Sequence, residues 1–325
     1  MRFRIGLVLL ACVLAAPGAD KGDWKSARTA WGDPDLQGIW DFRTITPLER
    51  PKQLGNKQVL SAEEAEEFQA ETLATRNKDR RVEDGITKQA DVASAYNQFW
   101  WDYGDTLTED KRTSLIVSPA SGRIPKKTAQ GETRYADIRA RRARPAHGPE
   151  DRGAFERCIL GFNAGPPYTP SAYNKNVHIL QTPDHVVLLI EMVHDARIVP
   201  IDGSPQLSEN IRQWRGDGRG HWEGGTLVVE SRNFSEKTSF RGTGKNLHLT
   251  ERFTRVGPDR VLYEYKIDDP EMFTESWSAA IPMKWSDQPM YEYACHEGNY
   301  AMESMLAGAR AQQAAEASTS SGESK

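Results

Sequence analysis

The sequence predicts a mainly β protein, either an antiparallel calycin-like barrel or a sheet folded on itself, with a helical N-terminal extension. Short runs of alternating β-branched or aromatic residues follow one another from Cys158 onward, and pairs containing Gly or Pro separate several of them. No helical pattern lies between these runs, which favours antiparallel neighbours. The expected strands cover residues 177–181, 186–199, 226–231, 247–254, 261–267 and 290–295.

The N-terminal extension has its own expected elements. An edge strand is expected to begin at 38–40, where Gly and Trp lie two residues apart. A Ser-x-x-Glu capping box at 61–64 predicts a helix that continues to about Arg76. A second amphipathic segment is expected before the aromatic residues at 96–103, and the stretch 112–125 reads as a hairpin of two short strands.

The chain is expected to comprise a signal peptide, the N-terminal extension, a β-rich core and a disordered tail, over residues 1–19, 20–145, 146–311 and 312–325. Arg2 and Arg4 precede a short apolar run that ends in small residues, which is typical of a secretory signal. We therefore expect export to the periplasm or the cell exterior. A lipoprotein-type signal is the alternative, in which Cys12 is lipidated and tethers the protein to a membrane.

Two cysteines, Cys158 and Cys295, remain once Cys12 leaves with the signal peptide. In an exported protein they most simply form one disulfide. The alternative is a free nucleophilic Cys295 beside His296, which would need a reducing or protected site.

The composition excludes several function classes. The 42 basic residues less Arg2 and Arg4 leave 40 against 46 acidic ones, or about −6, so nothing draws the chain to nucleic acid. P-loop, dinucleotide, His-Glu-x-x-His and Gly-x-Ser-x-Gly motifs are missing, so we expect no cofactor and no metal. The expected partner is a small molecule, with membrane attachment only if Cys12 is lipidated.

Phrases along nearly the whole mature chain resemble a family of exported bacterial proteins. They are PDLQGIWDFRTITPLERP, RTSLIVSPASGRIP, ERCILGFNAGPP, QTPDHVVLLIEMVHDARIVP, HWEGGTLVVESRNF, HLTERFTR and YEYACHEGNY. The resemblance implies export and assigns neither an activity nor a site residue. The Gly-x-Trp at 38–40, followed by meandering strands, is similar to lipocalin and calycin barrels.

The stretch VVLLIEMVHDAR at 186–197 holds the strongest candidates for chemistry, because charge inside a buried strand is costly unless it is paired or used. On one continuous strand, Glu191, Asp195 and Arg197 share a face and His194 lies on the other. A helix would instead bring Glu191 and His194 together as metal ligands, but the β-branched flanks favour a strand. Asp195 and Arg197 could equally form a structural ion pair.

Later strands add further candidates. Glu251 lies on an otherwise apolar strand face near His248, and Tyr263 and Tyr265 could line the same interior. A carboxylate in an apolar cavity with tyrosines has a raised pKa, which suits acid–base catalysis. Alternatively, the carboxylates pair with arginines and stabilise the barrel. The other substrate-binding candidates are Trp222, Glu230 and His296.

These residues predict a cofactor-free acid–base enzyme, a hydrolase, lyase or isomerase that acts on a small amphipathic molecule in a barrel-like cavity. His194 would act as acid or base, Glu191 or Asp195 would orient it, and Arg197 would hold an anionic or carbonyl oxygen. The alternative is a non-catalytic periplasmic or surface ligand-binding protein, which the lipocalin-like start and nine tryptophans indicate. A third interpretation, an envelope scaffold, requires that no cavity exists.

Overall fold

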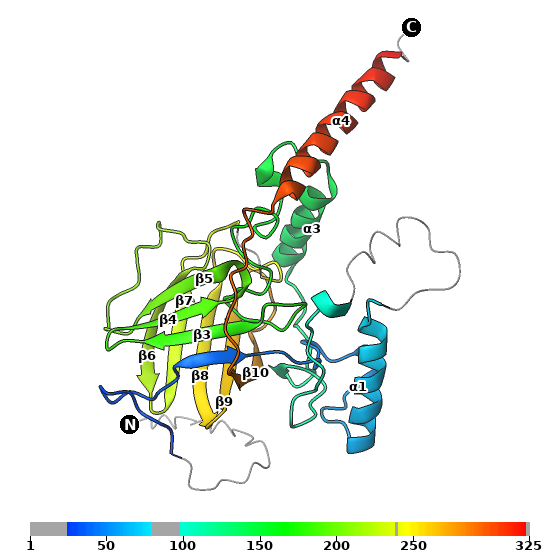
Figure 1. The fold of residues 1–325 in the computed structure, drawn as a ribbon. Helices are drawn as coiled ribbons and strands as arrows, with labels where there is room; N and C mark the ends of the chain where they lie inside the picture. The colour runs from blue at the N-terminus through cyan, green and yellow to red at the C-terminus, as the bar shows by residue number, and fades with distance from the viewer. Residues whose placement is uncertain (1–24, 80–97, 238–239, 323–325) are drawn as a thin grey trace, which may run out of the picture.

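The computed structural model describes residues 25–79, 98–237 and 240–322, and one antiparallel sheet dominates them (Figure 1). Its strands are β1 (Gly38–Asp41), β2 (Ile116–Ser118), β3 (Asn176–Gln181), β4 (His185–Ile190), β5 (Asp195–Pro200), β6 (Asp217–Glu223), β7 (Thr226–Arg232), β8 (His248–Gly257), β9 (Arg260–Asp268) and β10 (Trp277–Ser286). Their order is β5-β4-β3-β1-β10-β9-β8-β7-β6, with β2 paired to β10 off this path. The mainly β, antiparallel fold is therefore confirmed.

Alternation along the strands separates a buried face from an outer one. In β8 the side chains of Leu249, Glu251 and Phe253 are buried, and their neighbours in sequence are half-buried. Tyr263 and Tyr265 of β9 point into the same core. This is the period-two pattern that the sequence indicates, and it carries one acidic side chain into the interior.

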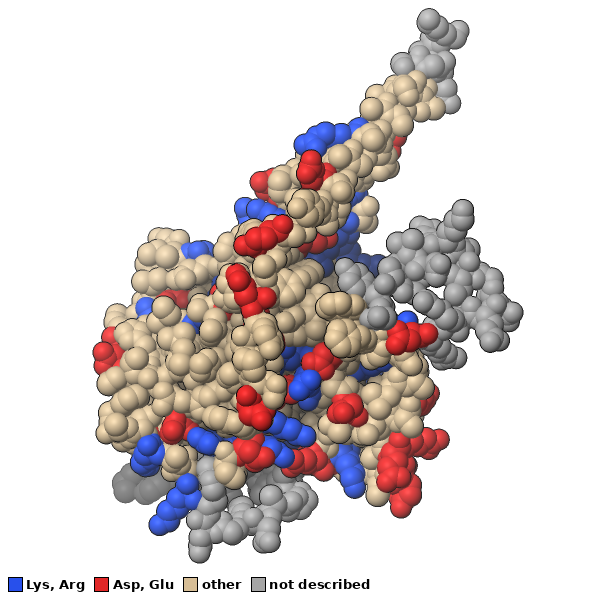
Figure 2. Space-filling model, in the orientation of Figure 1, with Lys and Arg blue, Asp and Glu red and all other residues tan. Residues whose placement is uncertain are grey.

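The apolar run of β4 has a different explanation from the predicted full burial. Val186, Leu188 and Ile190 enter the core, whereas Val187 pairs in register with Leu180 of β3 and Ile198 of β5 on the outer face. Ile198 is 66% exposed there. Figure 2 shows few charged side chains on this part of the surface. The residues of β4 are therefore apolar on both faces of the strand, because one face lies in the core and the other contacts apolar neighbours on the outer surface.

The predicted single strand over 186–199 is wrong, because the chain reverses within it. β4 ends at Ile190, a 3-10 turn η4 (Met192–His194) follows, and β5 returns antiparallel to β4. Val193 and His194 have positive φ angles of 61° and 41°, a backbone conformation that residues other than Gly rarely adopt. No Gly, Pro or Asn signals this turn.

Three further strand predictions need correction. β1 is a central strand between β3 and β10 rather than an edge. The stretch 112–125 forms no hairpin, because β2 pairs with β10 and the flanking backbone bonds to residues 47, 48 and 58. Residues 290–295 contain no strand, and β6 and β10 are additional strands.

The helices are α1 (Ala62–Arg76), α3 (Ala129–Ala143) and α4 (Tyr300–Gly322), with 3-10 turns η1 (Lys52–Leu54), η2 (Gln98–Trp100) and η3 (Pro149–Asp151). The capping box that predicts α1 is present, with the Ser61 side chain and the Glu64 side chain each accepting from the other residue's backbone N–H. The longest helix is C-terminal and projects from the body (Figure 1), so residues 312–322 are helical rather than disordered.

Some expectations fall outside the described residues. These are the signal peptide at 1–19, most of the amphipathic segment before residue 96, and the last three residues of the tail. Within the described ranges, no helix is both long and apolar enough to span a bilayer.

The two edges of the sheet, β5 and β6, face each other across a gap that we call the seam. In the described chain no ladder joins them, so the sheet is not closed. The sheet nevertheless curls on itself. The Arg197 side chain of β5 crosses from one edge to Ser231 of β7 and Glu251 of β8, which lie near the other edge. At one end the two edges are in contact, because the Val199 side chain packs on the backbone of Gly220, where a Cβ would lie 3.1 Å from Val199 Cγ1.

Candidate functional site

A cavity of about 470 Å³ lies at the seam. Four consecutive residues of β5, 196–199, form one side of it, and residues 212–216 with Gly218 form the other. Ile159 and Leu160 complete the wall. Its volume falls in the range of sites for small organic ligands.

The charged groups of the cavity are all cationic. Arg197, Arg212 and Arg215 line it, and none of the described residues lining it is Asp or Glu. Arg215 is paired with Asp195, which lies behind the lining. Arg212 donates to the Lys245 carbonyl oxygen at 2.9 Å and forms no ion pair with any described residue. Burial lowers the pKa of Arg215 to about 10.

Behind Arg197 lies a buried polar network. Its Nη1 and Nη2 donate to the two carboxylate oxygens of Glu251 at 3.2 and 2.7 Å, and the Tyr263 hydroxyl donates to Glu251 Oε1 at 2.7 Å. The backbone N–H of Tyr168 donates to the Tyr263 hydroxyl oxygen at 3.1 Å. A fully buried carboxylate thus has an opposite charge and a hydroxyl donor, which offset its desolvation.

The electrostatics of this network follow from its burial. Burial is the largest single effect on Arg197 and lowers its pKa, but Glu251 together with Tyr168 and Tyr263 outweighs burial, so the net shift is upward. Burial and then Glu251 raise the pKa of Tyr263 well above its usual value. Burial raises the pKa of Tyr168 to about 12, against the opposing effect of Arg197. Arg197 therefore stays charged and both tyrosines stay neutral near pH 7.

The cavity wall at Ile159 and Leu160 is anchored on two sides. Cys158 precedes it and forms the predicted disulfide with Cys295, which confirms that pairing. On the other side Gly161 packs on the turn η4, where a Cβ would overlap Met192 Cγ. The disulfide therefore connects this wall to the irregular segment that precedes α4.

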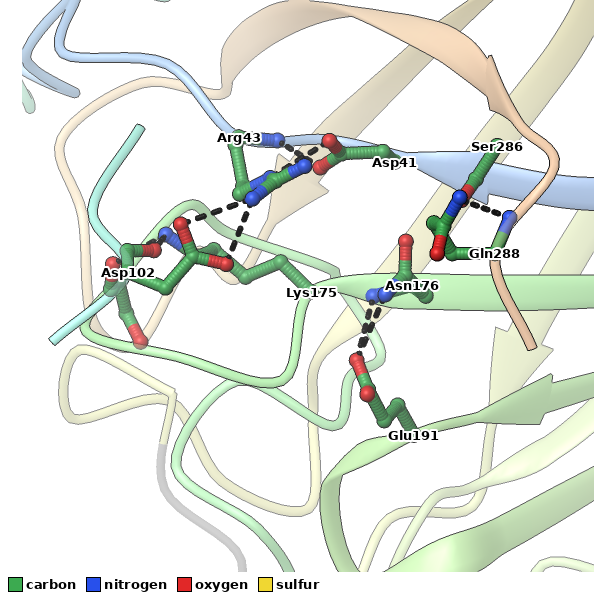
Figure 3. Close-up of polar contacts among 9 residues, drawn as sticks. Asp41, Arg43, Asp102, Lys175, Asn176, Glu191, Ser286 and Gln288 are labelled. Carbon is green, nitrogen blue, oxygen red and sulfur yellow. Dashed lines mark hydrogen bonds and ion pairs between the residues drawn. The ribbon is translucent and has the colours of Figure 1, made fainter. Parts of the chain in front are cut away.

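The candidates of the 186–197 stretch separate. Glu191 is buried, and its Oε2 accepts from the side-chain and backbone N–H groups of Asn176 at 2.9 and 3.3 Å (Figure 3). His194 is exposed, with Nδ1 3.1 Å from the Tyr293 carbonyl oxygen. Asp195 pairs with Arg215, and Arg197 with Glu251, so the alternative Asp195–Arg197 ion pair is absent from these described residues.

The other candidates lie apart from the cavity lining. Tyr265 is buried in the aromatic core against Trp277. His248 Nε2 lies 3.6 Å from Glu230 Oε1 on the outer face, and burial is the main cause that lowers the pKa of His248. Trp222 of β6 is half-buried and His296 is exposed. Of the sequence candidates, Arg197, Glu251 and Tyr263 meet in the buried network, and His248 and Glu230 meet on the outer face.

A second buried cation, Lys175, directly precedes β3 (Figure 3). Lys175 is 1% exposed and donates to the carbonyl oxygens of Asp102 and, at 2.8 Å, Ser171. Burial lowers the pKa of Lys175 to about 8. Arg43 lies beside it, between the carboxylates of Asp41 and Asp102. We assign this cluster to loop anchoring, because both hydrogen bonds of Lys175 to described residues go to backbone oxygens.

Sequence reasoning missed the residues just before β6. Arg212 and Arg215 are covered only by the general alternative that arginines pair with the carboxylates, and none of the sequence patterns described above points to Trp214, Gly216 or Gly218. The signal that could have found them is Gly at every second position from 216 to 220, since Gly inside a strand marks a close approach of backbone or ligand.

The fold and site define a curled, incompletely closed β-sheet protein with a cationic, partly apolar cavity at its seam. In the ranges described, no three His, Cys, Asp or Glu side chains gather as a metal site. No protein-family model matches the chain, and no curated protein matches it at a significant level.

Proposed function

We propose that this protein binds a small amphipathic anion in the seam cavity. The observation that carries the proposal is the lining itself, in which three arginines meet apolar side chains without a carboxylate. Arginine suits carboxylate or phosphate oxygens because its planar fork donates two parallel hydrogen bonds. A cavity with a few polar groups and apolar walls is the usual form of a small-molecule site.

The balance of charge supports an anion. Glu251 already neutralises Arg197, and Asp195 neutralises Arg215. Arg212 has no carboxylate partner in the described chain, so one positive charge is left for a ligand. The apolar part of the ligand would lie against Leu160 and Trp214.

The acid–base enzyme is a second candidate, supported by the polar network behind Arg197. Glu251 and Tyr263 are a proton acceptor and donor 2.7 Å apart, one side chain removed from the cavity. Only Arg197 of this network lines the cavity, and His194 and Glu191 do not. This separation favours binding over turnover.

We also propose that the protein is exported and belongs to the family of exported bacterial proteins that its sequence phrases resemble. The Cys158–Cys295 disulfide is compatible with an oxidising compartment.

Titration calorimetry with three eight-carbon probes tests the binding proposal. Octanoate should bind more tightly than octanol, and octylamine more weakly than either. Arg212→Gln should weaken octanoate about tenfold, because a charge-assisted hydrogen bond contributes about 1.5–3 kcal/mol. Arg139→Gln removes the same charge from an exposed position on α3 and should leave the affinity unchanged. Equal binding of the three probes, or equal effects of the two variants, would contradict the proposal.

A further inference from the structure

The seam cavity continues onto the outer face of the sheet. Ala196 and Ile198 of β5 line it, and their side chains point outward because they alternate with the buried Arg197 and Val199. Ile198 is 66% exposed. A ligand in the cavity can therefore extend past these two residues onto the outside of β5.

Two rows of outward side chains, which we call the outer strip, lead from these residues across β5, β4 and β3. In register order they are Ile198, Val187 and Leu180 in the first row, and Ala196, Leu189 and His178 in the second. None of the six is Asp, Glu, Lys or Arg, and Figure 2 shows few charged side chains over these strands. The outer strip is thus a largely apolar surface that begins at the cavity.

The spacing of the two rows matches one extended hydrocarbon chain. Residues two apart on a strand are separated by about 6.6 Å, and carbon atoms in contact by about 3.5–4 Å, so a chain between the rows touches both. Neighbouring strands are about 4.8 Å apart, so the outer strip extends about 10 Å from β5 to β3. A ligand that fills both the cavity and the strip needs a longer chain than one that fills the cavity alone.

The area of this face distinguishes a single chain from a larger partner. The outer face of β3, β4 and β5, six residues long in each strand, covers only about 200 Å². A stable protein interface buries about 800 Å² on each partner. The outer strip therefore fits the chain of a ligand better than it fits a second protein.

The charge left in the cavity defines the head of the ligand. Arg212 lines the wall opposite β5 and has no carboxylate partner in the described chain. Glu251 and Asp195 neutralise the other two arginines of the lining. One positive charge balances a carboxylate, whereas a phosphate monoester carries about −1.5 to −2 near pH 7. The cavity therefore favours a monoanion.

We propose that the anion bound in the seam is a long-chain carboxylate, whose head lies at Arg212 and whose chain passes Ala196 and Ile198 and lies along the outer strip. This inference rests on the proposed function and extends the ligand beyond the cavity. It gives the outward apolar side chains of β4 and β5 a role, because the hydrocarbon chain covers them when the ligand is bound. Each methylene group that leaves water stabilises the complex.

Calorimetry on the mature, disulfide-bonded protein tests this inference, with every probe below its micelle concentration. Dodecanoate should bind about tenfold more tightly than octanoate, because the outer strip covers one side of four further methylene groups. Leu180→Ser and Val187→Ser should each lower this ratio to about threefold. Val256→Ser, at a 55% exposed position on β8, should leave the ratio unchanged. Dodecyl phosphate should bind no more tightly than dodecanoate.

A nitroxide at the end of the dodecanoate chain locates the chain independently of affinity. It should broaden the methyl NMR signals of Val187 and Leu180 and leave those of Val256 sharp. Sharp signals at Val187 and Leu180 with the ligand bound would overturn the inference.

The outcomes separate the two proposals. If octanoate and dodecanoate bind equally, or if neither Leu180→Ser nor Val187→Ser lowers the ratio, the outer strip holds no chain and anion binding in the cavity stands. If dodecyl phosphate binds much more tightly than dodecanoate, the assignment of a carboxylate head is wrong. If neither octanoate nor dodecanoate binds, both proposals are wrong.

Discussion

Replacing Glu251 by Gln tests the buried network behind the cavity. The carboxylate is fully buried and accepts three hydrogen bonds, two from Arg197 and one from Tyr263. Glutamine has nearly the same shape but no charge, so Arg197, which is only 8% exposed, loses its counterion. Removing one partner of a buried ion pair costs about 3–5 kcal/mol, and we expect a loss of this size in the free energy of unfolding.

Urea denaturation, followed by circular dichroism, measures this loss. The matched control is Glu230→Gln on β7, whose side chain is 46% exposed and 3.6 Å from His248, with an expected effect below about 0.5 kcal/mol. Replacing Arg197 by Met together with Glu251 by Leu should recover most of the stability, because it removes both charges. A loss below about 1 kcal/mol for Glu251→Gln, or one equal to that of Glu230→Gln, would refute the reasoning.

Three other predictions concern the scaffold. Replacing Cys158 and Cys295 by Ser should lower the free energy of unfolding by up to about 5 kcal/mol in urea titrations, because the bridge joins residues 137 positions apart; a reductant that leaves the wild type equally stable would contradict this. Gly38→Ala should cost about 1–3 kcal/mol more than Gly32→Ala, since both have positive φ but only a Cβ on Gly38 meets a tryptophan ring; equal losses would contradict the packing. The Lys175 ammonium loses its proton near pH 8 in the folded chain and at about pH 10.5 in the unfolded chain. The free energy of unfolding of the wild type should therefore rise relative to that of Lys175→Met between pH 8 and pH 10. A constant difference between the two proteins in urea titrations across this pH range would contradict the prediction.

Alternation in the sequence predicts the strands whose two faces differ and misses the others. β8 and β9 have one buried face each and are predicted to within a few residues. β6 is missed because its sequence, DGRGHWE, has too few apolar side chains to show an alternating pattern. Its position at the seam depends on backbone contacts rather than on side-chain packing. β10 contains Pro282, which argues against a central strand, but β2 and β1 pair only with 278–279 and 284–286 and leave that position paired to β9 alone.

The candidate site could be predicted in part for the same reason. Parity along β8 places Glu251 on the buried face with Leu249 and Phe253. Arg197 lies beyond the unsignalled turn at η4, and the turn changes which residues face inward. Val186, Leu188 and Ile190 are buried before it, whereas Arg197 and Val199 are buried after it, so the meeting of Arg197 with Glu251 does not follow from local pattern. Arg212 and Trp214 lie in an irregular connection, whose path depends on long-range contacts that no local pattern encodes.

The four residues of β1 also set the order in which the sheet can be completed. They pair with β3 on one side and with β10 on the other, and so join the strands β3 to β5 to the strands β6 to β10. The partner at residues 284–286 is synthesised long after 38–41, and contacts of such sequence separation make folding slow. Removal of β1 would divide one sheet into two and create two new exposed edges, so an early truncation is expected to favour aggregation.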